Sequence, residues 1–183
     1  LENAKNHMTE NAAAYIWFPH KWAPILYEAY EKTGFLFRQT VIWLKDRPMV
    51  KPGVPFIRVF EPCFLASTKG KNMYFNPYTA GQPDAWKRSS IKEFIDQLDV
   101  WYAHKDNTTD YVHPTQKPVY LAQRAIQKNT QPGDIVLDLF GGSGSTLIAA
   151  EYMGRNAYLM EFDPYYCEVI KNRYDLLQKE NSK

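Results

Sequence analysis

The sequence is poor in the features that mark several protein classes. Only two of its 183 residues are cysteines, Cys63 and Cys167, which excludes a disulfide-stapled scaffold and favours a reducing cytosol. No apolar run approaches the roughly 18 residues of a membrane helix, and the polar start lacks the apolar core of a signal peptide. Lys+Arg 22 against Asp+Glu 20 is nearly balanced, so overall charge indicates no class of partner. We therefore expect a cytoplasmic protein with no membrane association.

The remaining composition is that of an ordinary globular domain. Hydrophobic residues make up 45% and charged residues 23% of the chain, which excludes a disordered chain and a coiled coil. Apolar periodicity, β-branched and aromatic runs, and glycines at helix ends predict the secondary structure. Strands are expected at 14–18, 37–44, 57–66, 135–140 and 156–162, and helices at 22–33, behind Pro118, at 145–153 and at 164–177.

The expected strands and helices predict an α/β fold, and the chain has three segments of different character. Residues 1–66 supply strands and a helix, 67–112 form a polar, irregular insert with one short helix near 91–98, and 113–183 follow a βαβα order. Strand–helix–strand units imply parallel strands. The apolar run at 135–140 is typical of a strand buried at the centre of a parallel sheet. We therefore predict a mostly parallel sheet.

A glycine-rich turn follows the predicted strand at 135–140. Gly141, Gly142, Ser143 and Gly144 let the backbone approach a ligand closely, and the exposed amides of the following helix start favour anionic groups. Ligands of α/β sheets bind at the carboxyl ends of strands, where this turn lies. Asp138 favours a ligand site over a plain turn, because a carboxylate near the end of a buried strand needs a partner.

Acidic residues around the turn narrow the choice of ligand. Gly142 and Gly144 match the start of a dinucleotide fingerprint, but Leu147 stands at its third glycine, and no lysine follows Gly144 as a P-loop requires. Glu161 lies near the end of the next strand, where an acid accepts hydrogen bonds from ribose hydroxyls. A ligand with a ribose, an ammonium group and no phosphate suits these residues, and S-adenosylmethionine has this chemistry.

Three motifs resemble the permuted β group of DNA amino-methyltransferases, which modify adenine N6 or cytosine N4. They are His113-Pro114-Thr115-Gln116-Lys117-Pro118, the loop from Asp138 to Thr146, and Gly154-Arg155 followed by Glu161-Phe162-Asp163-Pro164. The resemblance is specific over 113–178 and looser over 14–66. It implies a Rossmann-like methyltransferase fold that is incomplete at its N-terminal side, with 67–112 as the target-recognition insert and 113–183 as the cofactor-binding part.

The resemblance also implies a set of cofactor contacts. Asp138 and the loop 140–144 would hold the methionine part, Glu161 the ribose hydroxyls, and Thr115 with Lys117 the carboxylate end, where a lysine is physically sensible. His113 has no Cys/His/Asp cluster at metal spacing around it, so no metal site is expected. The cofactor-binding residues expected are Thr115, Lys117, Asp138, Phe140, Gly141, Gly142, Ser143, Gly144, Thr146 and Glu161.

The catalytic motif of this family is missing from the sequence. It reads Asp/Asn/Ser-Pro-Pro followed by an aromatic residue, and the chain has no Pro-Pro. In the β group this motif precedes every segment recognised here, so we expect it upstream of Leu1, or on a partner chain. We assign no catalytic residue, expect the isolated chain to be inactive, and expect buried sheet edges to be left unpaired.

A local excess of positive charge indicates nucleic acid. Residues 38–92 contain ten Lys/Arg against three Asp/Glu, interleaved with aromatic residues such as Tyr74, Phe75 and Trp86, as in a phosphate-binding surface with stacking groups. A solvated loop region is the alternative reading of the same charges. The expected contacts to double-stranded DNA are Lys45, Arg47, Lys51, Lys69, Lys71, Lys87 and Arg88.

The sequence thus predicts an S-adenosylmethionine-dependent DNA methyltransferase that transfers a methyl group to an exocyclic base amine. A non-catalytic DNA-binding or partner subunit with the same fold is the main alternative. A nicotinamide oxidoreductase is disfavoured by Leu147 and by the segment 113–118. The sequence does not discriminate adenine N6 from cytosine N4.

Overall fold

The chain divides into two compact units, Leu1–His104 and Lys105–Lys183. The computed structural model describes residues 1–49, 52–53, 55–68, 72–76, 98–104 and 116–181, without the side chains of 47–49. The short helix expected near 91–98 therefore lies outside the described residues, apart from its last position. Each unit has its own sheet, and each is described by itself below.

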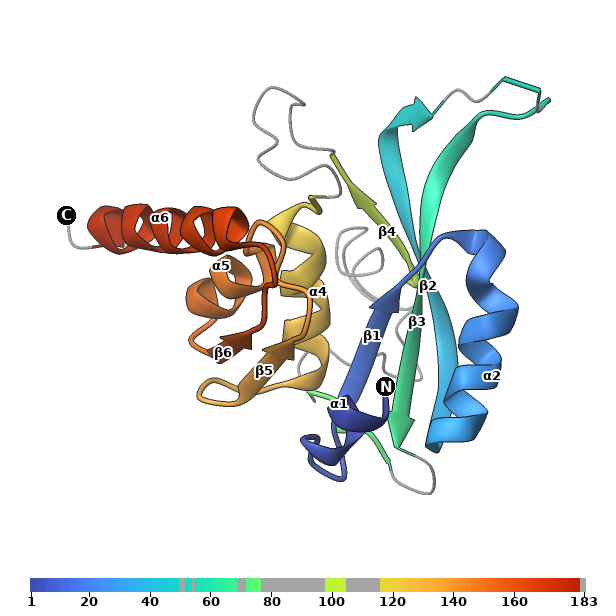
Figure 1. The fold of residues 1–183 in the computed structure, drawn as a ribbon, viewed down its shortest axis with the longest axis horizontal. Coiled ribbons are helices and arrows are strands. Elements are labelled where there is room, and N and C mark those ends of the chain that lie inside the picture. Colours follow the sequence, from blue (N-terminus) through green and yellow to red (C-terminus); the bar gives the residue numbers. More distant parts are fainter. Residues whose placement is uncertain (50–51, 54, 69–71, 77–97, 105–115, 182–183) are drawn as a thin grey trace, which may run out of the picture. The chain divides into compact units, whose positions relative to one another are not determined.

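The first unit is built on a four-stranded mixed sheet (Figure 1). The strands β1 (Ala13–Trp17), β2 (Phe35–Met49), β3 (Arg58–Thr68) and β4 (Val100–Ala103) are arranged in the order β1-β3-β2-β4. β3 is antiparallel to both β1 and β2, whereas β4 is parallel to β2. The α/β class is confirmed, but the sheet is mixed and not mostly parallel, because the short connection from β2 to β3 allows only a hairpin.

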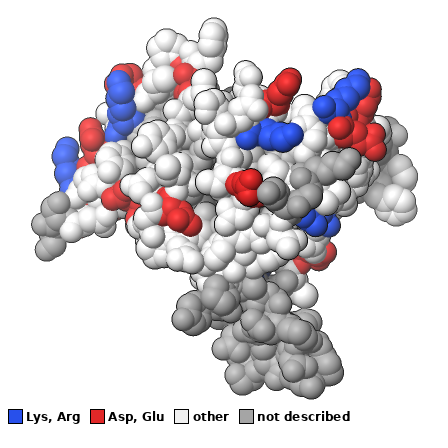
Figure 2. Space-filling model, turned by 90° about the horizontal axis from the view of Figure 1, so that it is seen from below, with Lys and Arg blue, Asp and Glu red and all other residues white. Residues whose placement is uncertain are grey.

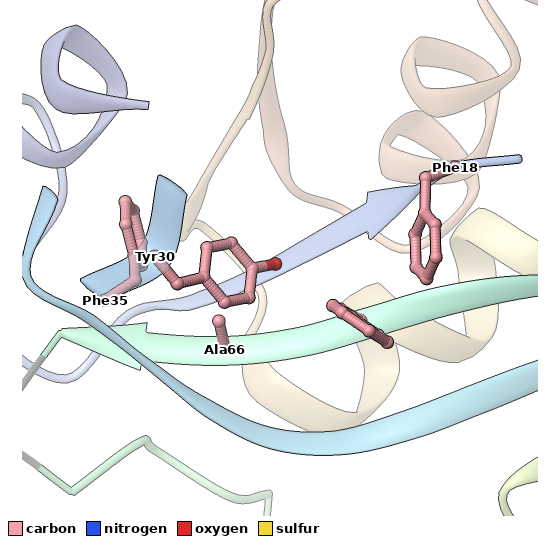
Figure 3. Packing of buried hydrophobic residues seen from close by; sticks show 5 residues of the cluster. Phe18, Tyr30, Phe35 and Ala66 are labelled. Carbon is pink, nitrogen blue, oxygen red and sulfur yellow. The ribbon is translucent and has the colours of Figure 1, made fainter. Parts of the chain in front are cut away.

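A helix covers one face of this sheet. The short elements α1 (Glu2–Asn6) and η1 (His20–Trp22) flank β1, and α2 (Ala23–Thr33) follows, ending at Gly34 in the left-handed conformation, as predicted. The buried cluster comprises Phe18, Tyr30, Phe35, Phe64 and Ala66 (Figure 3). Alternation along β3 directs Phe64 and Ala66 to the same face, where they form a cluster with Tyr30 of α2.

The opposite face of the sheet carries an aromatic group. Trp17 lies 6.3 Å from Trp43 and 6.4 Å from Trp101 between ring centroids. The indole of Trp43 donates a hydrogen bond of 3.0 Å to the carbonyl of Ala103. These contacts join β4 to the sheet, so the expectation of an irregular segment over all of 67–112 is wrong for residues 100–103. Four residues between polar neighbours give too weak a strand signal to be recognised.

The second unit has the expected βαβα order. Helix α4 (Val119–Asn129) precedes β5 (Ile135–Asp138), α5 (Ser145–Tyr152), β6 (Asn156–Leu159) and α6 (Pro164–Asn181), and β5 and β6 are parallel. Ile126, Ala149 and Ala150 form the buried centre of a cluster that also includes Val136 and Ala157. The two strands thus bury one face under α4 and α5.

Both strands are shorter and less buried than predicted. They end at Asp138 and Leu159, whereas the predicted strands extend to residues 140 and 162. The side chains of Ile135 and Leu137 are 66% and 40% exposed. The prediction of a strand buried on both faces is therefore wrong for this structure, in which β5 pairs with β6 alone among the described residues.

Candidate cofactor site

The candidate site lies where β5 and β6 end. The glycine loop, residues 140–144, connects β5 to α5, and the segment 160–163 connects β6 to α6. The amide of Gly141 donates to the carbonyl of Met160 at 2.8 Å, and that of Met160 donates to the carbonyl of Asp138 at 2.8 Å. These two bonds continue the pairing of the strands and hold the two connections together.

Asp138 is fixed by two donors close to it in sequence. One carboxylate oxygen accepts the amide of Phe140 at 3.0 Å, and the other accepts the hydroxyl of Thr146 at 2.6 Å. The side chain is partly buried. A carboxylate offers about four acceptor positions, so it can accept further hydrogen bonds from a ligand while these two keep its orientation.

Glu161 is attached to the glycine loop. One of its carboxylate oxygens accepts the amide of Gly142 at 2.7 Å, and the other accepts the amide of Asp163 at 2.9 Å. The carboxylate therefore bridges the two connections that follow β5 and β6. Asp138 and Glu161 are thus linked through the same loop, and both lie at the same end of the two-stranded sheet.

The amides of the glycine loop are used within the protein. Those of Phe140, Gly141 and Gly142 donate to Asp138, Met160 and Glu161, and that of Gly144 donates to the carbonyl of Gly141 at 2.8 Å. The amides expected to favour an anion are those of the helix start, from Ser145 onward, and that expectation stays a prediction. The side chains that accept the loop amides include two carboxylates, Asp138 and Glu161, and carboxylates suit hydroxyl and ammonium donors more than phosphate.

The loop is packed closely against α6. A Cβ atom on Gly141 would lie 3.2 Å from Cδ1 of Ile170, and one on Gly144 would lie 3.1 Å from Cγ1 of the same residue. Gly144 also has a φ of 82°, which side chains rarely adopt. The glycines are therefore required by the backbone turn and by contact with the helix.

One partner of the loop has no signal in the sequence. The guanidinium of Arg173, on α6, donates a hydrogen bond to the carbonyl of the buried residue Ser143. Arg173 lies in the middle of a polar helical segment, outside the motifs that resemble the family. The separation of 30 residues means that only the folded structure brings the two together.

The structure describes Phe140 and Lys117, two further residues predicted to bind the cofactor, but not Thr115. Phe140 is 88% exposed at the start of the loop. Lys117 is partly buried, and its carbonyl accepts the hydroxyl of Ser145 at 2.7 Å, which ties the segment before α4 to the first residue of α5. Thr115 lies outside the described residues. Its cofactor contact, like those of the other predicted residues, stays a prediction.

The predicted DNA contacts are mostly beyond the described part of the chain. Lys45 is described, but its side chain is only 7% exposed, forms an ion pair with Glu61 and lies 4.7 Å from the ring of Trp43. On the face in Figure 2, described Lys and Arg side chains are interspersed with Asp and Glu. The backbone of Arg47 lies in β2. The others lie outside the described residues: Lys51, Lys69, Lys71, Lys87 and Arg88.

The described residues include neither a metal-binding cluster nor a membrane-spanning helix. Within these ranges no group of three His, Cys, Asp or Glu side chains is placed to hold a metal ion. The helices described here also include none with the length and apolar character needed to cross a membrane.

The fold and the loop define an α/β protein in which two carboxylates, Asp138 and Glu161, are held at the carboxyl ends of a pair of parallel strands. A family model described as DNA methylase (N6_N4_Mtase) matches residues 1–172, so the chain belongs to the N6/N4 DNA methylase family. The predicted family is thereby confirmed. The permuted β group and the position of the missing motif stay predictions.

Individual relatives agree with this assignment. The type II methyltransferase M.HpaI of Haemophilus parainfluenzae is 26% identical over 96% of this chain and 57% of its own length. M2.DpnII of Streptococcus pneumoniae is 26% identical over 84% of this chain and 56% of its own length. The chain thus spans little more than half the length of these curated relatives.

Solved structures show the same fold. A crystal structure of the M1.HpyAVI–SAM complex matches with a TM-score of 0.73 and 26% identity, over 91% of this chain and 76% of that chain. The PvuII DNA methyltransferase, which is cytosine-N4-specific, matches with a TM-score of 0.71 and 17% identity, over 91% and 65% of the two chains. The methyltransferase fold is confirmed.

Proposed function

We propose that this chain is the cofactor-binding part of an S-adenosylmethionine-dependent DNA methyltransferase that modifies adenine N6 or cytosine N4. The observation that carries the proposal is the pair of carboxylates, Asp138 and Glu161, held at one end of β5 and β6 by the amides of a single glycine loop. Family membership and the M1.HpyAVI–SAM complex support it.

The residues present fit the proposed cofactor. S-adenosylmethionine carries an ammonium group and two ribose hydroxyls, all of which are hydrogen-bond donors, and Asp138 and Glu161 are acceptors. A phosphate-containing dinucleotide fits less well, because the amides of Phe140, Gly141, Gly142 and Gly144 already donate within the protein. Lys117, and Thr115 in the segment before it, are the proposed partners of the cofactor carboxylate.

When bound, the cofactor would supply an electrophilic methyl group to the base amine. The chain would bind and orient the cofactor, and a base flipped out of the duplex would enter beside it. We propose that the missing Pro-Pro motif is supplied by a segment upstream of Leu1 or by a partner chain. The isolated chain is then expected to transfer no methyl group.

Double-stranded DNA is the proposed partner of the positively charged region 38–92. Lys45 is the least suited of the predicted contacts, because its charge is paired with Glu61 and largely buried. The slope of log K against log salt is negative, and we expect replacement of Lys51, Lys69 and Lys71 together by alanine to reduce its magnitude by about 0.9 for each lost phosphate contact. A Lys32→Met control, at an exposed lysine of α2 outside this region, should leave that slope unchanged.

A methyl-transfer assay tests the proposed activity. Tritiated methyl groups would be followed from S-adenosylmethionine into duplex DNA, with the 183-residue chain and with the same chain extended upstream in its gene. Transfer by the extended chain alone, abolished by Asp138→Ala, supports the proposal. No transfer by an extended chain that contains Pro-Pro contradicts it. Cofactor and DNA binding without Pro-Pro or transfer would favour the non-catalytic subunit.

A further inference from the structure

We infer that Arg173 is a positioning residue for the cofactor loop. The inference rests on the proposed function, because it assigns a partner to a loop whose cofactor role is itself proposed. Its basis is the hydrogen bond from the Arg173 guanidinium to the carbonyl of Ser143, which lies between Gly142 and Gly144. Holding this carbonyl restrains the peptide groups in the middle of the loop.

The glycine loop needs such a restraint. Three of its residues are glycines, which have more backbone freedom than any other residue. The amide of Gly142 donates to Glu161, and the amide of Phe140 donates to Asp138. The carbonyl of Ser143 shares its peptide group with the amide of Gly144, which donates to the carbonyl of Gly141 at 2.8 Å. Rotation of that peptide group would break this bond and loosen the turn that directs the two amides at the carboxylates.

Two residues of α6, Ile170 and Arg173, contact the glycine loop. Ile170 and Arg173 are three residues apart, so they lie on the same face of the helix. Ile170 packs against Gly141 and Gly144 so closely that neither position has room for a side chain. Arg173, about one turn further along the helix, donates to Ser143. Ser143 is 4% exposed. Loss of Arg173 would therefore remove a charge-assisted donor from a site that water reaches poorly.

Arg155 provides a matched control. It is partly buried in the same unit, and its guanidinium donates to Thr130, through the hydroxyl at 3.0 Å and the carbonyl at 2.9 Å. It thus ties the residue before β6 to the residue after α4, at the opposite end of β6 from the glycine loop. An arginine that only stabilises the unit and one that positions the loop should therefore differ in their effect on cofactor affinity.

The test compares Arg173→Met, Arg173→Gln, Arg173→Lys and Arg155→Met in the 183-residue chain. Calorimetry would give the Kd for S-adenosylmethionine, thermal denaturation the Tm, and amide hydrogen exchange the protection of residues 140–146. We expect Arg173→Met to raise the Kd at least tenfold and to speed exchange of the loop. Arg173→Lys and Arg173→Gln, which still donate, should recover part of the affinity. Arg155→Met should lower the Tm with the Kd and loop exchange unchanged.

Two results would overturn the inference alone. The first is an Arg173→Met protein that binds the cofactor as tightly as the wild type with unchanged exchange of the loop. The second is an equal rise in Kd for Arg155→Met. If Arg173→Met does not fold, the Gln and Lys variants decide between the same outcomes. A wild-type chain that folds but does not bind S-adenosylmethionine overturns the proposed function, and the inference falls with it.

Discussion

Asp138 and the hydroxyl of Thr146 form the shortest described hydrogen bond at the site that involves two side chains, 2.6 Å between oxygens. Thr146→Val keeps the shape of the side chain and removes the donor. We expect the Kd for S-adenosylmethionine to rise about tenfold, since a hydrogen bond to a charged group contributes roughly 1.5–3 kcal/mol. Thr146→Ser, which retains the hydroxyl, is the control in the same calorimetric titration. Equal affinities of the Val and Ser variants would show that Thr146 does not orient Asp138.

Tyr30 is a buried tyrosine of α2. Its hydroxyl is buried with no hydrogen-bond partner among the described residues, and burial raises the pKa of the phenol well above its ordinary value. The folded state therefore disfavours the phenolate. Stability from this group is fully present below the ordinary pKa of about 10 and is lost as pH rises above it.

Tyr30→Phe should thus reduce the loss of stability in alkali. At neutral pH we expect the free energy of unfolding to stay equal or to rise by up to about 1 kcal/mol, because an unpaired buried hydroxyl is removed. Urea denaturation of both proteins at about pH 7, 9 and 11 measures the difference. A Phe variant that is less stable at neutral pH would indicate a hydrogen bond to the hydroxyl in solution.

At the scale of elements, the packing of α6 on the glycine loop predicts unequal effects of two glycine substitutions. Gly133 and Gly144 have similar φ values, 87° and 82°, but nothing lies within 4 Å of a Cβ on Gly133, whereas Ile170 lies 3.1 Å from one on Gly144. Gly133→Ala should cost about 1–2 kcal/mol for the left-handed backbone alone. Gly144→Ala should cost more and should also weaken cofactor binding. Equal losses in Tm would contradict close packing of α6.

The hairpin of β2 and β3 contains a partly buried ion pair with unequal partners. Lys45 is 7% and Glu61 35% exposed. Removal of Glu61 would leave the more buried charge without its carboxylate. Glu61→Met should therefore lower the free energy of unfolding by about 1 kcal/mol or more beyond the effect of Lys45→Met. Urea denaturation of the two variants measures the difference. A larger loss of unfolding free energy for Lys45→Met would mean that Glu61, and not Lys45, is the more buried partner.

For the whole molecule, sequence periodicity predicted most of the described elements. The turn at Gly34, the hairpin strands and the βαβα order depend on local patterns of apolar residues and glycines, which the structure reproduces. The strand β4 was missed because Val100–Ala103 acquires its place from pairing with β2. Pairing between strands that are distant in sequence leaves little trace in a four-residue segment.

The site was predictable in its residues but not in its hydrogen bonds. Motif spacing identified Asp138, Glu161 and the glycines between them. It gave no indication that Glu161 accepts the amide of Gly142, or that Arg173 reaches Ser143. Such contacts depend on the relative placement of β5, β6 and α6. A motif fixes residue types, whereas the direction of an amide or a guanidinium is determined by tertiary structure.

A calorimetric titration with S-adenosylmethionine determines whether these 183 residues contain the cofactor site. Asp138→Ala removes a carboxylate at the carboxyl end of β5. Asp134→Ala, the control, removes one just before the same strand, where it accepts the amide of Gln131. We predict saturable binding to the wild type and to Asp134→Ala, and none to Asp138→Ala. A folded wild-type chain that does not bind S-adenosylmethionine, or binds NAD in its place, would contradict the proposed cofactor site.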